Sequence, residues 1–325
     1  MPNSLPLVSV ICLCYKHARF VAEALDSVLA QTYPHWELII IDDQSPDNSV
    51  TVIQDWITQH TPQPQAISFL ALEQNVGNCA AFNRGLAQAK GQYVIDFAAD
   101  DVLLPQRLAE QVSLLEANPQ AAAAFADALL ISETGQPLHT HFRRDANGKL
   151  LETVASGNIF RRLFLGHFIC SPTLMFRAQP LRALGGYDET LAYEDFDVMM
   201  RLARNWDLLF QDSVQTKYRV VRGSLSQQFY TQRQNKMLSS TLIICQKADN
   251  LCINQEEKQA LAVFVRYHLR QSAFMHNPDL VQKYANLLQQ MGLLDWTSKL
   301  ILTFSRFGLN LYPIYKCYLW TKKYF

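Results

Sequence analysis

The segment QYVIDFAADDVLLP, residues 92–105, decides the fold because it joins a strand pattern to a pair of acidic residues. Its apolar first half is typical of a buried strand, and it stops at Asp100 and Asp101, just before a predicted helix. A carboxylate is costly to remove from water and is seldom buried without a partner. Two adjacent carboxylates at a strand end therefore indicate either a helix cap or a binding site.

The same order of strand and helix repeats through the first part of the chain. Each apolar run is followed by a segment whose apolar residues recur at helical spacing. Such repeats predict an α/β fold with right-handed crossovers and a mostly parallel sheet flanked by helices. The predicted pairs of strand and helix are 7–14 with 18–31, 36–41 with 48–59, 66–72 with 78–90, and 92–99 with 105–118.

Downstream of these repeats the pattern becomes less regular and then helical. Further strands are predicted at residues 121–131 and 168–176, where apolar runs resume. The last hundred residues are predicted to be almost wholly helical. We therefore expect an α/β domain over residues 1–226 and a helical C-terminal region over residues 227–325.

Charge balance and cysteine content exclude several classes of protein. The 29 Lys and Arg residues balance 29 Asp and Glu residues, so nucleic acid is not an expected partner. Seven cysteines, an odd number in a chain of 325 residues, do not predict a disulfide framework. Cys12 and Cys14 share one face of a predicted strand, and without further ligands at metal-binding spacing we expect both to be buried thiols.

Terminal and hydropathy signals indicate the compartment. No basic segment precedes the first apolar stretch, and no run of about 18 apolar residues, long enough to span a bilayer, occurs in the sequence. The cytoplasm is therefore the expected location.

Two other enzyme classes with α/β folds lack their sequence signatures here. CYKHAR follows the first predicted strand where a nicotinamide-dependent oxidoreductase would carry a G-x-G-x-x-G turn. The G-x-x-x-x-G-K-[ST] pattern of a P-loop kinase is also absent from the sequence. We accordingly expect no organic cofactor.

A second pair of adjacent aspartates favours a binding site over a helix cap as the role of Asp100 and Asp101. Asp42 and Asp43 end the strand predicted at 36–41, as Asp100 and Asp101 end the strand predicted at 92–99. Ligands of such sheets bind at the carboxyl ends of the strands. One pair alone is as well explained by helix capping, but two pairs at the same sheet edge favour a site.

Several stretches, in this order along the chain, together resemble family 2 of the inverting, nucleotide-sugar-dependent glycosyltransferases. They are residues 8–47, 75–94, 99–105, 185–202 and 218–226. The resemblance implies a Rossmann-like GT-A fold and an enzyme of the hexosyltransferase type. Its implied reaction moves one sugar, with inversion, from a nucleotide-diphosphate sugar to a hydroxyl of a glycan or lipid-linked acceptor. The implied setting is bacterial cell-surface polysaccharide synthesis. The expected donor is uridine-based, with guanosine and deoxythymidine as the alternatives.

The resemblance also implies which residues bind the nucleotide. Tyr15 corresponds to the residue that packs on the base, and Asp43 to the one that accepts a hydrogen bond from the pyrimidine edge. Asn75 and Gly77 lie in the loop before a helix whose N-terminus suits phosphate, and Arg84 is a candidate diphosphate contact. The structural alternatives are a sheet-edge aromatic for Tyr15, a helix cap for Asp43 and a solvated surface side chain for Arg84.

Asp100 and Asp101 correspond to the end of the family's D-x-D-D metal motif. We expect Asp100 to bind Mg²⁺ or Mn²⁺ and the donor diphosphate, with Asp101 in support. The first aspartate of that motif is replaced by Ala98, and the histidine of a Y-R-x-H pattern by Val221. Metal binding is therefore predicted to be weak, because Asp96, on the same strand face as Ala98, is expected to lie too deep to substitute. A catalytically silent nucleotide-sugar-binding or scaffold protein of the same fold is the alternative.

Glu194 and Asp195 resemble the family's E-D motif, in which the aspartate is the general base. A carboxylate is ionised at neutral pH, and a helix N-terminus stabilises its charge. Asp197 is expected to face solvent, and a capping box or an acidic turn is the alternative for the pair. QQFYTQRQ, residues 227–234, lacks the Q-x-x-R-W pattern of processive members, which favours transfer of a single sugar.

Residues 296–325 contain five basic side chains, several aromatic ones and no acidic one. Such a segment suits the surface of a membrane, with its aromatic rings at headgroup depth. Peripheral contact with the inner face of the membrane would suit an enzyme with a lipid-linked acceptor. A helix that packs on the rest of the protein explains the segment equally well.

Overall fold

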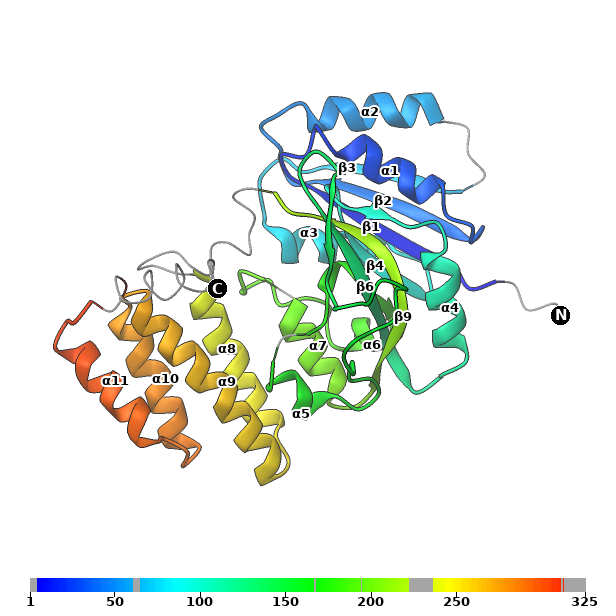
Figure 1. The fold of residues 1–325 in the computed structure, drawn as a ribbon. Coiled ribbons are helices and arrows are strands. Elements are labelled where there is room, and N and C mark those ends of the chain that lie inside the picture. Colours follow the sequence, from blue (N-terminus) through cyan, green and yellow to red (C-terminus); the bar gives the residue numbers. More distant parts are fainter. Residues whose placement is uncertain are drawn as a thin grey trace. The chain divides into compact units, whose positions relative to one another are not determined.

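The computed structural model describes residues 5–60, 65–166, 168–193, 195–221, 236–310 and 312. The chain forms two compact units (Figure 1). The α/β unit comprises Met1–Ile159, Phe168–Glu189 and Tyr193–Val221, and the helical unit comprises Phe160–His167, Thr190–Ala192 and Arg222–Phe325. The predicted domain boundary between residues 226 and 227 lies outside the described residues.

The α/β unit begins with the predicted strand–helix repeats, which the structure confirms. The strands are β1 (Val8–Cys14), β2 (Trp36–Asp42), β3 (Ile67–Ala71) and β4 (Tyr93–Ala98). The helices are α1 (Val21–Leu29), α2 (Ser49–His60), α3 (Asn78–Gln88) and α4 (Arg107–Glu116). These strands are parallel, in the order β3-β2-β1-β4. Cys14 pairs with Asp42 and Leu13 with Ala98, so β2, β1 and β4 end at the same level.

Beyond β4 the sheet is mixed. Its order continues β4-β8-β6-β9-β5, with β7 paired to β6. The bounds are β5 (Val102–Leu103), β6 (Ala121–Ile131), β7 (Pro137–Thr140), β8 (Met175–Arg177) and β9 (Asp207–Arg219). β6 runs parallel to β9, whereas β8 is antiparallel to both of its neighbours.

The strand predicted at 168–176 is shorter than expected. Residues Ser171–Thr173 form a 3₁₀ turn, η1, and only β8 is strand. Pro172 explains the difference, because proline has no N–H to give to a strand ladder.

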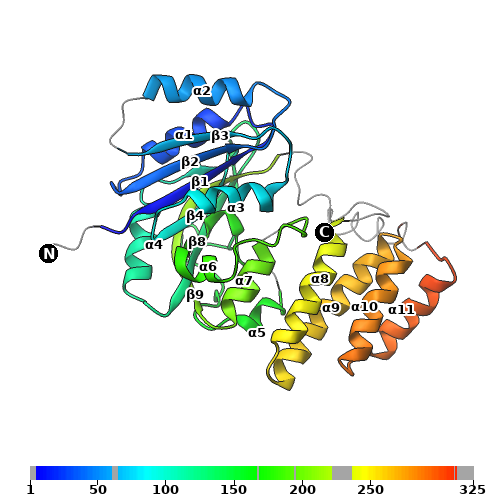
Figure 2. The same ribbon diagram turned by 180° about the vertical axis from the view of Figure 1, so that it is seen from behind.

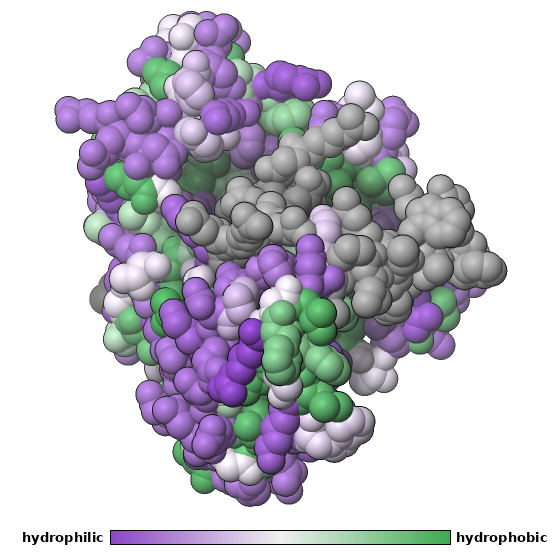
Figure 3. All heavy atoms as spheres, turned by 90° about the vertical axis from the view of Figure 1, so that its left-hand side faces the viewer, coloured by the Kyte–Doolittle hydropathy of each residue, from purple (hydrophilic) through white to green (hydrophobic). Residues whose placement is uncertain are grey.

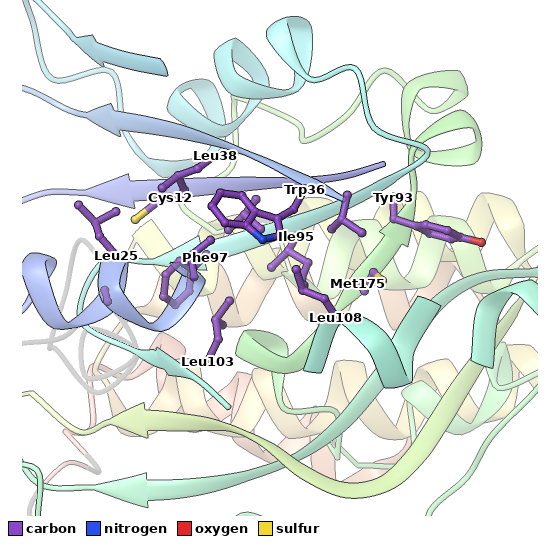
Figure 4. Packing of buried hydrophobic residues seen from close by; sticks show 14 of the residues in the cluster. Cys12, Leu25, Trp36, Leu38, Tyr93, Ile95, Phe97, Leu103, Leu108 and Met175 are labelled. Carbon is purple, nitrogen blue, oxygen red and sulfur yellow. The ribbon is translucent and has the colours of Figure 1, made fainter. Parts of the chain in front are cut away.

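The main hydrophobic core lies on one face of the first four strands. Alternate residues of β1, β2 and β4 pack with α1, α2 and α4, and Figure 4 shows Cys12, Trp36, Ile95 and Leu108 among them. Burial raises the pKa of the Cys14 thiol to about 12, and it also raises the pKa of Cys12. Both cysteines are therefore the inert buried thiols that we expected.

α3 covers the opposite face of the sheet, as the views in Figures 1 and 2 allow the reader to follow. A Cβ atom on Gly85 of α3 would lie 2.5 Å from Cγ2 of Ile11 and 3.0 Å from Cδ1 of Ile41. The missing side chain lets α3 sit directly on β1 and β2. Two more helices complete this unit, α6 (Ala178–Ala183) and α7 (Asp195–Ala203).

The helical unit confirms the predicted helical C-terminal extension. It contains α5 (Phe160–Leu163), α8 (Lys236–Leu251), α9 (Gln255–Phe274), α10 (Pro278–Gln290) and α11 (Trp296–Arg306). Asn254, Asn277 and Asp295 cap α9, α10 and α11 by accepting hydrogen bonds from backbone amides of the first turn. Within the described residues, no helix has the length and apolar character needed to cross a bilayer.

The close packing of α3 on the sheet gives a first prediction. We expect Gly85→Ala to lower the free energy of unfolding by about 1–2 kcal/mol, because overpacking at fully buried Ile11 and Ile41 outweighs the gain in helix propensity. Urea unfolding followed by circular dichroism measures the change. Gln88→Ala, at an exposed position of the same helix, is the control and should stay within about 0.5 kcal/mol of wild type. A Gly85→Ala protein as stable as wild type would contradict this account.

Candidate active site

The loops after β1 and β2 are tied together at the sheet edge. The amide of Asp43 donates to the carbonyl of Cys14 over 2.9 Å, and the amide of Lys16 donates to Oγ of Ser45 over 2.9 Å. Lys16 and Gln44 adopt φ angles of 63° and 57°, which few residues other than glycine adopt. Such backbone conformations persist where the surroundings impose them and are concentrated at functional sites.

Tyr15 stands at this edge with 40% of its surface exposed. The Nζ atom of Lys16 lies 4.8 Å from the centre of its ring. The ring is therefore available to stack on a flat ligand, with an ammonium group close to it.

The carboxylate of Asp43 organises the loop that leads into α3. It accepts hydrogen bonds from the amides of Val76 (2.7 Å) and Gly77 (2.9 Å). The carbonyl of Asp43 accepts a further bond from Nδ2 of Asn75 at 2.9 Å. Each carboxylate oxygen can accept more than one hydrogen bond, so Asp43 keeps capacity for a ligand.

Gly77 immediately precedes α3 and has a φ of +84°. A Cβ at this position would meet no atom within 4 Å, so the space in front of the glycine is open. A ligand can therefore approach the backbone at the N-terminus of α3, where amide groups and the helix dipole favour anions.

Asp100 and Asp101, which follow β4, have different surroundings. Asp100 is partly exposed, whereas Asp101 is buried and accepts the amide of Arg219 at 2.8 Å. Burial and the nearby charge of Asp100 raise the pKa of Asp101 well above its ordinary value. The structure therefore leaves Asp100 as the accessible carboxylate of this pair.

Arg219, the last residue of β9, stabilises the conformation of Asp100 and Asp101. Its side chain is almost fully buried and donates from Nε to the carbonyl of Asp100 at 2.8 Å and from Nη2 to Glu23 at 2.6 Å. The guanidinium also lies 4.8 Å from the ring centre of Phe20. The sequence analysis missed this role, because the pairing of β9 with β5, the short strand that follows Asp101, has no local signal.

His17 is a second site residue that the sequence analysis missed. Its Nε2 atom lies 3.7 Å from Oδ2 of Asp100, and its buried Nδ1 atom has no hydrogen-bond partner among the described residues. The signal was present, since His17 follows directly after Tyr15 and Lys16 at the end of a predicted strand.

These donors fit a weakly held divalent cation. Carboxylate oxygen is the preferred ligand of Mg²⁺ and Mn²⁺, and Mg²⁺ is often held by one or two carboxylates with phosphate and water. The Asp100 side chain has oxygen atoms of this type, and the imidazole of His17 lies beside it. The side chains of Val221 and Ala98 have no ligand atoms, and no cluster of three His, Cys, Asp or Glu residues that could hold a metal occurs within the part of the chain that the structure describes.

Asp195 opens α7, and both of its carboxylate oxygens accept hydrogen bonds. Oγ of Ser171 donates to Oδ2, and the amide of Phe196 donates to Oδ1, each over 2.6 Å. Burial is the main cause of a raised pKa at Asp96 of β4, and the charge of Asp195 adds to it. Glu194 lies outside the described residues.

Asp197 does not face solvent, so that expectation was wrong. It is fully buried and accepts a hydrogen bond from Nε of Arg201, one turn further along α7, over 2.7 Å. Arg201 also donates to the carbonyls of Leu184 and Gly186. The ion pair thus joins α7 to the preceding loop, a contact that helical spacing alone does not reveal.

Arg84 remains apart from the other candidates. It is exposed on the second turn of α3, and no hydrogen bond or ion pair joins its side chain to any other described residue. Its assignment to the diphosphate stays a prediction.

The chain belongs to glycosyl transferase family 2, whose sequence profile matches residues 9–185. Two similar proteins are known from Bacillus subtilis (strain 168). EpsE, a glycosyltransferase by name, is 30% identical over 202 residues, which are 61% of this chain and 67% of EpsE. TuaG, a teichuronic acid biosynthesis glycosyltransferase by name, is 34% identical over 138 residues, which are 42% of this chain and 53% of TuaG. The family that the sequence motifs indicated is confirmed.

Solved structures support the fold. The crystal structure of Staphylococcus aureus TarS in complex with UDP-GlcNAc matches with a TM-score of 0.67 and 17% identity, over 93% of this chain and 87% of that one. A mannosyltransferase from Pyrobaculum calidifontis, in complex with GDP-Man and Mn²⁺, matches with a TM-score of 0.59 and 19% identity, over 94% of this chain and 81% of that one. The α/β fold is thus shared with glycosyltransferases and is consistent with the expected GT-A class.

The environment of Arg219 gives a second prediction. We expect Arg219→Lys to lower the free energy of unfolding by about 2–3 kcal/mol, because one ammonium cannot replace a guanidinium that bonds on several sides. Arg143→Lys is the control, since the Arg143 side chain is 78% exposed and should tolerate the change within about 0.5 kcal/mol. Urea unfolding of the three proteins measures both effects. Equal stability of wild type and Arg219→Lys would show that the Arg219 guanidinium does not stabilise the segment that contains Asp100 and Asp101.

Proposed function

We propose that this family 2 glycosyltransferase transfers one hexose from a nucleotide-diphosphate sugar, with uridine as the expected base, to a hydroxyl acceptor. The proposal depends mainly on one arrangement, the level ends of β2, β1 and β4, which carry Asp43, Tyr15 and Asp100. The nucleotide sugars in the TarS and Pyrobaculum structures support a donor of this class.

In this proposal, the loops after β1 and β2 bind the nucleotide. Tyr15 stacks on the base, and Asp43 accepts a hydrogen bond from its edge while holding the 75–77 loop in place. The diphosphate lies before the open backbone of Gly77, at the N-terminus of α3. Arg84 is a weaker candidate for the same diphosphate.

Asp100 would hold the cation, with His17 beside it and Asp101 keeping the motif in place. A divalent cation bound there supplies positive charge that stabilises the departing diphosphate. Because Ala98 removes one carboxylate of the family motif, we expect affinity for Mg²⁺ or Mn²⁺ to be low.

Asp195 is the proposed general base, with Glu194 as its neighbour in the motif. Ser171 and the amide of Phe196 fix the orientation of its carboxylate. The acceptor oxygen bonds to the anomeric carbon as its proton passes to Asp195. The bond from that carbon to the diphosphate oxygen breaks, and its electron pair leaves with the diphosphate. This single displacement inverts the anomeric centre.

The acceptor is proposed to be a glycan or a lipid-linked glycan of a bacterial surface polymer. The name of TuaG places that protein in teichuronic acid biosynthesis, and we extend this setting to the present chain as part of the proposal.

The proposed donor site and base give a third prediction. Nucleotide-diphosphate sugars with Mn²⁺ should raise the melting temperature of wild type and of Asp195→Asn equally, because Asp195 acts on the acceptor. Turnover should fall about 10²- to 10⁴-fold in Asp195→Asn alone. Asp55→Asn, on the exposed face of α2, is the control and should keep full turnover.

Two outcomes would contradict the proposed donor or the proposed catalysis. No stabilisation by uridine, guanosine or deoxythymidine diphosphate sugars, with or without Mn²⁺, would refute the donor assignment. Stabilisation without turnover on any glycan or lipid-linked acceptor would favour the catalytically silent alternative.

We further propose that α11 lies on an anionic membrane surface. Trp296, Leu300, Phe304 and Phe307 recur at helical spacing and are each at least 44% exposed. Figure 3 views the side on which α11 lies in Figure 1 and shows apolar side chains (green) among polar ones (purple). The basic Lys299 and Arg306 are exposed on the same helix, and residues 296–310 contain no acidic side chain. An apolar face with basic flanks suits the inner leaflet, where anionic lipids are found.

The membrane proposal gives a fourth prediction. Wild type should co-sediment with phosphatidylglycerol vesicles at low salt and less with phosphatidylcholine vesicles. Replacing Trp296, Phe304 and Phe307 together by serine should weaken this binding by at least about tenfold, since the buried apolar area is lost. Ile253→Ser, at an exposed position between α8 and α9, is the control. If wild type stays in the supernatant with anionic vesicles at low salt, α11 is a packing helix only.

A further inference from the structure

Arg107, the first residue of α4, is a buried cation that is bonded to neutral groups. Its side chain is completely removed from solvent. Nε donates to Oε1 of Gln111 over 3.3 Å, and Nη1 donates to Oγ1 of Thr216 over 2.8 Å. No carboxylate of the described residues lies within ion-pair distance of this guanidinium. Burial of a charge is costly, so the bonds of Arg107 must offset a large desolvation free energy.

The other bonds of Arg107 fix the 3₁₀ turn η1. Nη1 also donates to the carbonyl of Pro172 over 2.8 Å, and Nη2 donates to the carbonyl of Leu174 over 3.0 Å. Gln111, one turn further along α4, donates to the intervening carbonyl of Thr173 over 2.7 Å. Two side chains of α4 therefore hold three successive carbonyl groups.

Thr173 also joins η1 to β6. Its fully buried hydroxyl accepts the amide of Ala126 over 2.9 Å and lies 3.0 Å and 2.7 Å from the carbonyls of Ala126 and Cys170, to which it can donate. A 3₁₀ turn of three residues makes few hydrogen bonds of its own. The contacts from α4 and β6 therefore decide where η1 lies.

Ser171 begins η1 and contacts the proposed base. Its Oγ atom donates to Oδ2 of Asp195 over 2.6 Å. The other oxygen, Oδ1, accepts the amide of Phe196, the next residue of α7, which moves together with Asp195. Among the described residues, Ser171 is thus the group that bonds the Asp195 carboxylate from outside α7.

We propose that Arg107 is a positioning residue for Asp195, which it holds in place through η1 and the hydroxyl of Ser171. This inference rests on the proposed function for the role of Asp195 as general base. Proton transfer requires the carboxylate to lie within hydrogen-bond reach of the acceptor hydroxyl, and a displacement of about 1 Å can cost about a hundredfold in rate. Arg107 therefore acts on catalysis without contact with the substrate.

A purely structural role for Arg107 makes a different prediction. Arg177 provides the comparison, because its guanidinium also donates to backbone carbonyls, those of Ala121 and Leu115. Arg177 pairs with Tyr93, the first residue of β4, and so lies at the opposite end of this strand from the acidic residues. Loss of either guanidinium should lower stability, but only loss of Arg107 should lower turnover.

The kinetic test compares Arg107→Lys with Arg177→Lys. One ammonium cannot bond the carbonyls of Pro172 and Leu174 as a guanidinium does, so kcat of Arg107→Lys should fall by about tenfold to a hundredfold. KM for the nucleotide-sugar donor should stay within about twofold, because Asp195 acts on the acceptor. Arg177→Lys should keep the kcat of wild type. Wild-type kcat in Arg107→Lys overturns the inference, as does an equal loss in both variants.

Thr216→Val replaces Arg107→Lys in this test if the lysine variant does not fold. It removes one acceptor of the guanidinium and should lower kcat by about threefold to tenfold. Thr216→Ser, which keeps the hydroxyl, should have the kcat of wild type. Equal kcat in the valine and serine variants contradicts the role of this contact.

Ser171 offers a milder change, because its side chain is only half-buried. Ser171→Ala should lower kcat by about tenfold, and Ser171→Thr, which keeps a hydroxyl, should retain most of the wild-type value. In Asp195→Asn, the alanine substitution should lower turnover no further, because it acts through that carboxylate. A further fall of the same size in Asp195→Asn contradicts the route through Ser171.

Urea unfolding tests the same route without turnover. Ser171→Ala and Asp195→Ala should be coupled by about fivefold or more in the folding equilibrium constant, because the bond between these side chains is charge-assisted. In Arg107→Lys, or in Thr216→Val, this coupling should fall below about twofold. The same coupling with and without the Arg107 contacts overturns the inference. If Asp195→Asn retains full turnover, the assignment of the base fails, while this cycle still decides whether Arg107 positions the carboxylate.

Discussion

The hydrogen-bond register of β1 with its two neighbours governs the site. Cys14 pairs with Asp42 and Leu13 with Ala98, so three loops leave the sheet at one level and carry Tyr15, Asp43 and Asp100. A slip of one residue in either pairing would turn the side chains of that strand to the opposite face. It would exchange the buried Ile95 and Phe97 with Asp96, so the core on one face fixes the acidic groups on the other.

The register places two adjacent aspartates at the end of β4, and Arg219 stabilises both of them. Two acidic side chains follow one strand, and Asp101 is buried. The amide and guanidinium of Arg219 reach Asp101 and the carbonyl of Asp100 from a strand more than a hundred residues later. The end of β4 is thereby held by backbone contacts, and the Asp100 carboxylate remains free to meet a ligand.

Much of this architecture could be predicted because strand and helix periodicities are local. The four strand–helix repeats, the helical C-terminal unit and the acidic strand ends all followed from nearby residues. The burial of Asp197, the contacts of Arg219 and the bond from Tyr187 to Asp96 join segments whose proximity depends on the packed fold. Asp96 was expected to be too deep for metal, and its partner could not be foreseen because Tyr187 lies 91 positions away. β8 is shorter than the predicted strand because Pro172 cannot donate a hydrogen bond to a strand ladder.

The cysteines determine how the protein can be probed chemically. Within the described residues, Cys12, Cys14, Cys79, Cys170 and Cys245 are buried, and Cys252, at the end of the helical unit's first long helix, is only partly covered. Buried thiols react slowly, so a maleimide dye added to the native protein should label Cys252 before these five. A fluorophore there would report on the helical unit.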